Sequence, residues 1–172
     1  MLLLQNIFVP GQEDHNQNKI QESLTLADFY LNCGLPESGQ KCFEAGACPG
    51  GWTWVLAGLG AQVYAVDRAE LAPELMQNPL VKFRAHDAFT IPPEEVGQVD
   101  WVFSDVICYP ERLLEWIHVW LESGLTKHMI CTIKMQGAID WGLIGKFEEI
   151  PDSKILHLNY NKHERTFIHI SP

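Results

Sequence analysis

The sequence predicts an α/β fold in which a doubly wound, mostly parallel sheet ends in an antiparallel hairpin at one edge. Short apolar runs alternate with helical segments through most of the chain, which is typical of a parallel sheet with helices on both faces. Near the end, Lys154–Tyr160 and Arg165–Ile170 alternate between apolar and polar residues, and only residues 161–164 separate them. This spacing predicts the hairpin.

Local signals justify each predicted element. Apolar residues recur at helical spacing from Ile20 to Leu31, and Gly34 ends that leading helix. The run from His128 to Lys134 is apolar before its terminal lysine, as expected of a strand that is covered on both faces. In chain order we expect helices over residues 17–33, 52–59, 69–76, 110–121 and 138–147, and parallel strands over residues 41–44, 62–67, 81–87, 99–105 and 128–134.

Length and composition predict one globular domain. Within the 172 residues, we expect residues 1–39 to form an N-terminal segment with the leading helix and residues 40–172 to form the sheet domain. Residues 11–18 are the longest candidate for disorder. The opening Met1–Leu4 is too short for a membrane span and lacks signal-peptide features, which predicts a cytoplasmic protein with no membrane partner. The five cysteines lack the spacing of a disulfide framework or a zinc site, so no metal is expected.

A glycine-rich segment, KCFEAGACPGGW from Lys41 to Trp52, predicts a buried strand that runs through a tight turn into a helix. Its glycines permit positive φ and a close approach of the backbone, and amides at the helix start point toward a bound group. The G-x-x-P-G-G spacing behind an acidic residue departs from the dinucleotide fingerprint and favours a nucleoside cofactor. The alternative is an ordinary strand-to-helix turn. The candidate binding residues are Glu44, Gly46, Cys48, Pro49, Gly50, Gly51 and Trp52.

Three later strands also end in a carboxylate: Asp67, Asp87 and Asp105. A single aspartate at such a place is commonly a helix cap or turn residue. Four successive strands with an acidic end, counting Glu44, favour a site, because the carboxyl ends of parallel strands line one crevice. Asp67 follows the glycine turn at the spacing where nucleotide-binding folds place a carboxylate on a ribose diol. Glu44 is expected to face the same crevice.

Five motifs fall in a fixed order along the chain. They are Glu44–Trp52, Ala65–Asp67, His86–Phe89, Val102–Val106 and Thr132–Lys134. In this order they resemble the FtsJ/RrmJ-type family of S-adenosylmethionine-dependent ribose 2′-O-methyltransferases. The resemblance covers about residues 40–170 and is strongest to the catalytic domain of the enzymes that modify a cytidine of large-subunit ribosomal RNA. It implies a seven-stranded Rossmann-like class I methyltransferase sheet, S-adenosylmethionine as cofactor, and Asp87 on its adenine amino group.

The same resemblance implies a catalytic Lys-Asp-Lys-Glu tetrad, in which Asp105 and Lys134 match the two central positions. Methyl transfer to a ribose hydroxyl needs a cation that stabilises the developing alkoxide or removes its proton, and Lys134 is our candidate. A structural ion pair between Asp105 and Lys134 is the alternative. Glu164 is the candidate for the last acid, provided that the strand register turns its side chain to the same face.

The first lysine of the tetrad departs from the family pattern. Where the family has Leu-Lys-Leu in its leading helix, this sequence has Leu24-Thr25-Leu26. Lys19 lies six residues upstream of Thr25. Lysines in helices are seldom buried, so the sequence favours a surface position for Lys19. The other interpretations are that Lys19 substitutes for the missing lysine or that the function has been lost.

The net charge of −10 argues against an enzyme that binds RNA by itself, because RNA binding depends on Lys and Arg that neutralise phosphates. Residues 127–172 hold six Lys or Arg against five acids, a balance of +1, which leaves −11 for residues 1–126. We therefore expect RNA, ribosomal RNA above all, to meet the C-terminal part, with a separate RNA-binding partner; DNA is not expected. An ordinary solvated acidic surface is the alternative interpretation of this charge distribution. The alternatives are a methyltransferase that acts on a small molecule or protein, and a cofactor-binding module with degenerate catalysis.

Overall fold

The computed structural model describes residues 15–172, so the predictions for Met1–Leu4 and for residues 11–14 lie outside the described part. The strands are β1 (Lys41–Ala45), β2 (Gln62–Asp67), β3 (Val81–Ala85), β4 (Trp101–Ser104), β5 (His128–Lys134), β6 (Ser153–Leu156) and β7 (Glu164–Ile170). They form a seven-stranded sheet in the order β3-β2-β1-β4-β5-β7-β6. β1 to β5 pair in parallel, whereas β7 is antiparallel to both β5 and β6. The predicted doubly wound sheet with an antiparallel C-terminal hairpin is confirmed.

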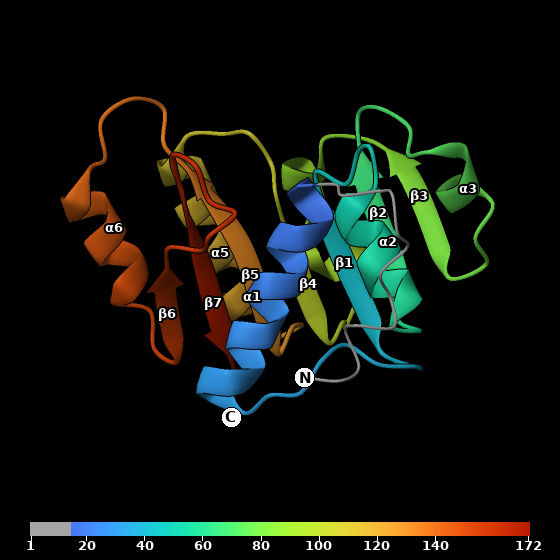
Figure 1. Cartoon of the computed structure of the whole chain (residues 1–172), viewed down its shortest axis with the longest axis horizontal. Helices are drawn as coiled ribbons and strands as arrows, with labels where there is room; N and C mark the ends of the chain where they lie inside the picture. Colours follow the sequence, from blue (N-terminus) through green and yellow to red (C-terminus); the bar gives the residue numbers. More distant parts are fainter. Residues whose placement is uncertain (1–14) are drawn as a thin grey trace.

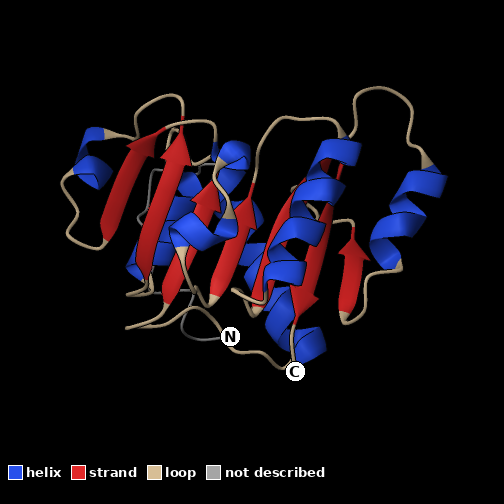
Figure 2. Cartoon of the chain, turned by 180° about the vertical axis from the view of Figure 1, so that it is seen from behind, coloured by secondary structure: helices blue, strands red, loops and turns tan. Residues whose placement is uncertain are grey.

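Helices cover both faces of the sheet. In residues 15–172 the α-helices are α1 (His15–Leu31), α2 (Gly51–Gly58), α3 (Pro73–Met76), α4 (Pro93–Val96), α5 (Pro110–Ser123) and α6 (Trp141–Glu148), and a 3-10 turn, η2, spans Ala88–Thr90. Figure 1 shows α1 and α2 on the near face, and Figure 2 shows α5 and α6 from the opposite side. The result is a three-layer arrangement in which each face of the sheet has its own apolar core.

Alternation along the strands decides which residues meet which layer. On β5 and β7, Ile130 and Ile168 pack toward α1 and α2, whereas Cys131 and Phe167 pack toward α5 and α6. Even-numbered residues of β5 and β7 therefore face α1. The pairing of β5 with β7 places Lys134 opposite Glu164, so both side chains belong to the α1 face.

The element boundaries differ from the sequence prediction mainly at the ends. The leading helix begins at His15, so residues 15–18, which the composition marked for disorder, are helical. Two short helical segments, η2 and α4, were not predicted. The largest difference is β6, which ends at Leu156 instead of continuing to Tyr160. The segment from 157 to 163 is a loop, and this loop reaches the site described below.

Candidate active site

A cavity of about 530 Å³ opens at the carboxyl ends of the parallel strands. It lies where the strand order reverses between β1 and β4, the place where open α/β sheets bind ligands. Eight of the residues predicted for the site line this cavity: Lys19, Gly46, Cys48, Asp67, Asp87, Asp105, Lys134 and Glu164. Five others do not: Glu44, Pro49, Gly50, Gly51 and Trp52.

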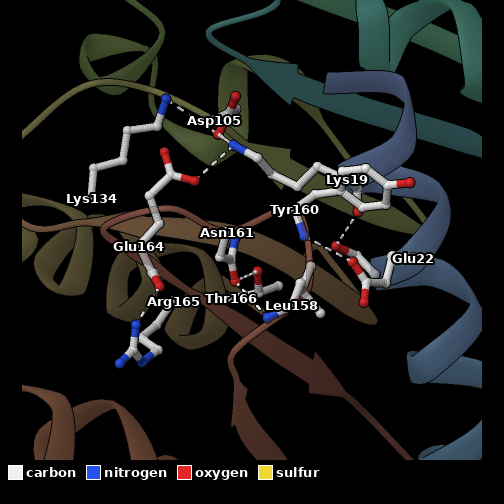
Figure 3. A network of polar contacts seen from close by, with 11 residues as sticks. Lys19, Glu22, Asp105, Lys134, Leu158, Tyr160, Asn161, Glu164, Arg165 and Thr166 are labelled. Atoms are coloured by element: carbon white, nitrogen blue, oxygen red, sulfur yellow. Dashed lines mark hydrogen bonds and ion pairs between the residues drawn. The ribbon is translucent and has the colours of Figure 1, made fainter. Parts of the chain in front are cut away.

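Four charged side chains meet at one end of the cavity (Figure 3). The Nζ atom of Lys19 lies 3.2 Å from Oδ1 of Asp105 and 2.9 Å from Oε2 of Glu164. The Nζ atom of Lys134 lies 3.3 Å from the same oxygen of Asp105. We call these four residues the tetrad. Asp105 thus lies between two ammonium groups, and Glu164 is paired with the one from α1.

The fold explains why these four residues meet. Asp105 directly follows β4, where Trp101 and Phe103 face α1 and α2, so the next odd-numbered residue points to the same side. Lys134 and Glu164 are register partners on that side as well. A shift of one residue in the pairing of β7 would have turned Glu164 toward α5 and α6. The strand register therefore turns Glu164 to the same face as Lys134, which was the condition for its assignment as the last acid.

The position of Lys19 corrects the interpretation of the leading helix. Lys19 is only 2% exposed, so it is not the surface residue that the sequence favoured. Thr25 lies more than a turn further along α1, and its hydroxyl donates a hydrogen bond to the carbonyl of Gln21. Lys19, in the N-terminal part of α1, is the residue of this helix that pairs with Asp105. The site of the first lysine is thus filled from a different position on the same helix.

Asp67 is held firmly at the end of β2. One carboxylate oxygen accepts a hydrogen bond from the amide of Cys48 at 3.0 Å, and the other accepts one from the amide of Ala69 at 3.1 Å. Burial, followed by the charge of Asp67, raises the pKa of the Cys48 thiol. Cys48 therefore stays a thiol at neutral pH, which suits a residue that shapes the turn better than a nucleophile.

Asp87 lines the cavity together with two arginines that the sequence prediction missed. Its carboxylate accepts hydrogen bonds from Arg68 at 3.0 Å, from Arg112 at 3.2 Å, and from the amide of Phe89 at 3.1 Å. Burial alone would raise the pKa of Asp87, but the Phe89 amide and the two guanidinium groups together lower it. No pattern marked Arg68 or Arg112, since exposed arginines in a turn and a helix are ordinary surface residues.

The glycine turn after β1 packs mainly against neighbouring segments of the protein, and only part of it lines the cavity. A side chain at Gly46, where φ is +76°, would come within 2.7 Å of Val106 in the loop after β4. Gly50, with φ of +118°, packs against Leu75 of α3 instead of the cavity. Gly51 begins α2, and Trp52 is buried there against Phe103. These residues therefore shape the wall behind the cavity, which corrects the expectation of direct contact for Pro49 through Trp52.

Glu44 also lies behind the cavity and not on its surface. The residue is 2% exposed, and its carboxyl group accepts a hydrogen bond of 2.6 Å from the hydroxyl of Thr53 on α2. Burial raises the pKa of Glu44 to about 8, and the charges of Asp105 and Asp67 contribute to that rise, while the bond from Thr53 opposes it. The expected orientation toward the crevice was wrong, because the side chain follows the face of β1 that α2 covers.

Lys162 is a further cavity residue that the prediction missed as a site residue. It lies in the loop between β6 and β7, two residues before Glu164, and it is exposed at the cavity. In the sequence, Lys162 was counted only among the six basic residues of the C-terminal part. The extended strand expected up to Tyr160 hid the loop that brings it here.

The described residues contain no group of three or more His, Cys, Asp or Glu side chains placed to hold a metal ion. Across residues 15–172, none of the helices combines the length and hydrophobicity needed to cross a bilayer.

Comparison with known proteins adds a family and a fold. A family model described as FtsJ-like methyltransferase matches residues 23–128. The ribosomal RNA large subunit methyltransferase M of Xylella fastidiosa is 37% identical over 135 residues, which cover 78% of this chain and 38% of that protein. The same-named protein of Hahella chejuensis is 28% identical over 134 residues, which cover 34% of its length. The chain thus spans well under half of these relatives.

Solved structures resemble the chain over almost its whole length. A protein described as a hemolysin from Lactococcus lactis superposes with a TM-score of 0.67 at 15% identity, over 93% of this chain and 88% of the other. A protein described as a ribosomal RNA methyltransferase from Plasmodium falciparum superposes with a TM-score of 0.63 at 14% identity, over 92% of this chain and 97% of the other. At these identities the likeness concerns the fold alone.

Proposed function

We propose, because the chain belongs to the FtsJ-like methyltransferase family, that it transfers a methyl group from S-adenosylmethionine to a ribose 2′-hydroxyl of RNA, with large-subunit ribosomal RNA as the substrate. The observation that carries this proposal is the tetrad of Lys19, Asp105, Lys134 and Glu164 at one end of the cavity. Two ammonium groups held by two carboxylates suit an acceptor that is a weak nucleophile at neutral pH.

The other end of the cavity fits the nucleoside part of the cofactor. Asp67 presents a carboxylate that two amides already orient, and we assign it to the ribose diol. We assign Asp87 to the adenine amino group, since it lines the same end with one more carboxylate. At Gly46, the absence of a side chain lets the turn and Val106 form a continuous wall for a flat ligand. The residues present therefore fit S-adenosylmethionine, which supplies a methyl group on a positively charged sulfur.

Each member of the tetrad has a role in this proposal. Lys134 holds the acceptor hydroxyl and stabilises the negative charge that develops on its oxygen, and the released proton passes to solvent water because an ammonium group cannot accept it. Asp105 orients the ammonium groups of both lysines through one carboxylate oxygen. Glu164 fixes Lys19 from the other side, so that the buried cation keeps a partner on each side. Positioning of the hydroxyl in line with the methyl group supplies much of the rate.

The test of this function is the variant Lys134→Ala. We expect methyl transfer from radiolabelled S-adenosylmethionine to large-subunit ribosomal RNA, transcribed without modifications, to fall by at least about a hundredfold. Cofactor affinity, measured by calorimetry, should change little because Lys134 lies at the acceptor end. Lys146→Ala, an exposed lysine of α6, is the matched control and should behave as the wild type. Retained turnover in Lys134→Ala would refute the assigned role.

A methyltransferase of small molecules is the second candidate, and the net charge of −10 favours it, because an acidic protein repels RNA. Mass spectrometry of ribosomal and transfer RNA nucleosides from cells that lack the protein separates the two. One missing 2′-O-methyl mark supports the first candidate, and an unchanged set of marks supports the second. The third hypothesis, a cofactor-binding module without catalysis, was based on Thr25 at the place of the first lysine. Because Lys19 supplies an ammonium group to the tetrad, Thr25 no longer supports that hypothesis.

A further RNA-binding part is consistent with the first candidate. The chain spans 38% of the length of its Xylella fastidiosa relative, and its overall charge opposes capture of a long polyanion. We therefore propose that ribosomal RNA is captured with the help of a separate RNA-binding partner or region. The contribution that this chain itself makes to RNA binding is considered next.

A further inference from the structure

The charges that line the cavity are unevenly distributed between its two ends. At the nucleoside end, Arg68 and Arg112 accompany Asp67 and Asp87, so the formal charges balance. Near the tetrad, the charged side chains among the described lining residues are the lysines Lys19, Lys134 and Lys162, the last of which lies two residues before Glu164, and the carboxylates Asp105 and Glu164. Among the lining residues that belong to 15–172, this end therefore holds one more positive than negative side chain, although the whole chain carries −10.

Lys162 is the source of that excess. Lys19 and Lys134 are paired with the tetrad carboxylates, and both arginines are paired with Asp87. The ammonium group of Lys162, by contrast, forms no hydrogen bond or ion pair with any residue of 15–172. An exposed lysine without a partner is common on protein surfaces. This one lines the reaction cavity of a strongly acidic chain.

The loop that carries Lys162 is held in place on two sides. The carboxylate of Glu22 on α1 accepts hydrogen bonds from the backbone amide of Asn159 at 3.0 Å and from its side-chain amide at 2.8 Å. It also accepts one from the backbone amide of Tyr160 at 3.3 Å (Figure 3). On the other side, the ring of His163 hydrogen-bonds the carbonyl of Gly137 in the loop after β5. Lys162 therefore projects from an anchored segment between two fixed points.

We infer that Lys162 binds a backbone phosphate of the RNA strand next to the ribose that is methylated, and that Glu22 positions the loop for this contact. The inference rests on the proposed function. In RNA every ribose is joined to phosphates on both sides, so a ribose hydroxyl held at Lys134 brings an anion to the same end of the cavity. An ammonium group that pairs with none of residues 15–172 can bind such a phosphate as a point charge.

The carboxylate of the cofactor is the rival ligand for Lys162. The position of the loop favours the phosphate, because Lys162 is exposed on the hairpin side of the cavity, whereas the residues assigned to the cofactor end lie on β2, β3 and their loops. The two ligands predict different outcomes. Loss of a phosphate contact raises KM for RNA, and loss of a carboxylate contact weakens cofactor affinity.

The experiment measures steady-state methyl transfer to unmodified large-subunit ribosomal RNA by the full chain, at several salt concentrations. For Lys162→Gln we expect KM for RNA to rise about tenfold and the slope of log(kcat/KM) against log(salt) to become shallower by about one, as for one lost phosphate contact. The turnover number at saturating RNA should stay within about twofold, and Lys162→Arg should retain most of the affinity because it keeps the charge. The matched control is Lys154→Gln, which removes an exposed lysine from β6 of the same hairpin.

An unchanged KM for RNA in Lys162→Gln overturns the inference, and so does an equal increase in Lys154→Gln. A weaker affinity for S-adenosylmethionine, measured by calorimetry, assigns Lys162 to the cofactor instead and also overturns it. If the wild type methylates no RNA, the proposed function fails. In that case fluorescence anisotropy with a labelled fragment of the same RNA decides about Lys162 separately: weaker binding by Lys162→Gln than by Lys154→Gln supports the phosphate contact, and equal binding refutes it.

Discussion

At the scale of single residues, Lys19 is the side chain whose role depends most on tertiary structure. Its ammonium group is buried between Asp105 and Glu164, and its pairing partners come from β4 and β7, far away in the sequence. The family resemblance placed the first lysine of the tetrad at Thr25, because Leu24 and Leu26 match the two leucines of the family pattern. Spacing along one helix cannot reveal where that helix crosses the sheet, and the crossing point decides which residue reaches Asp105.

This difference gives a direct test with Lys19→Met, which keeps the aliphatic stem and removes the charge. We expect methyl transfer to fall by at least about a hundredfold. The free energy of unfolding should fall by about 3 kcal/mol, because two partly buried carboxylates lose a cation. Thr25→Ala is the control and should keep wild-type activity. Adding Thr25→Lys to Lys19→Met should restore nothing, and recovery of activity in that double variant would show that the sequence-based position was right.

Glu44 makes a second residue-scale prediction, which concerns pH. Burial holds its pKa at about 8 in the folded protein, against an ordinary value of 4.5. Between these two values the unfolded chain has lost the proton that the folded chain still holds. The free energy of unfolding should therefore fall as pH rises through this window, by at most about 1.4 kcal/mol per pH unit from this group, and the loss should end above about pH 8.

The measurement is urea unfolding of the wild type and of Glu44→Gln at several pH values from 5 to 9. The glutamine keeps an oxygen that accepts the Thr53 hydroxyl but cannot ionise. The stability of the variant relative to the wild type should thus increase between pH 5 and pH 8. Parallel pH profiles for the two proteins would contradict the buried, protonated state of Glu44.

At the scale of elements, the loop from 157 to 163 shows how side chains end a strand. Alternating residues predict a strand up to Tyr160, and the backbone amides there do need partners. They find them in side chains: Glu22 accepts the amides of Asn159 and Tyr160, and Asn161 accepts the amide of Leu158 at 2.9 Å. No local pattern reveals a carboxylate on a helix far earlier in the chain. The apolar strands β1 to β5, by contrast, follow from their own composition and were predicted to within a few residues.

The loop also gives a prediction about Glu22. In Glu22→Ala, the loop loses three hydrogen bonds to α1, and Lys162 loses its fixed position. We expect KM for RNA to rise several-fold, about as much as in Lys162→Gln, and hydrogen exchange at Asn159 and Tyr160 to accelerate. The double variant should be no worse than Lys162→Gln alone, because both changes act on one contact. Gln21→Ala is the control on the same helix. Additive increases in KM would show that Glu22 acts independently of Lys162.

At the scale of the whole molecule, sequence reasoning succeeded where one physical rule governs many residues. Parallel strands with acidic ends must bring those ends to one edge, and the cavity indeed forms there from Asp67, Asp87 and Asp105. The rule fails for Glu44, since the direction of a side chain at a strand end depends on which face the strand presents. Charge is a further example. The net charge of −10 can be read from the composition, whereas the excess of lysines beside the tetrad becomes visible only in the folded chain.

The course of α1 has a practical consequence for anyone who shortens this protein. The family match begins at residue 23, a natural place to cut, yet Lys19 and Glu22 both precede it on the same helix. A version that begins at residue 23 and keeps everything after it would retain all seven strands and lose the buried ammonium of Lys19 and the loop anchor Glu22 together. Its inactivity would then reflect the choice of boundary and say nothing about the chemistry of the intact chain.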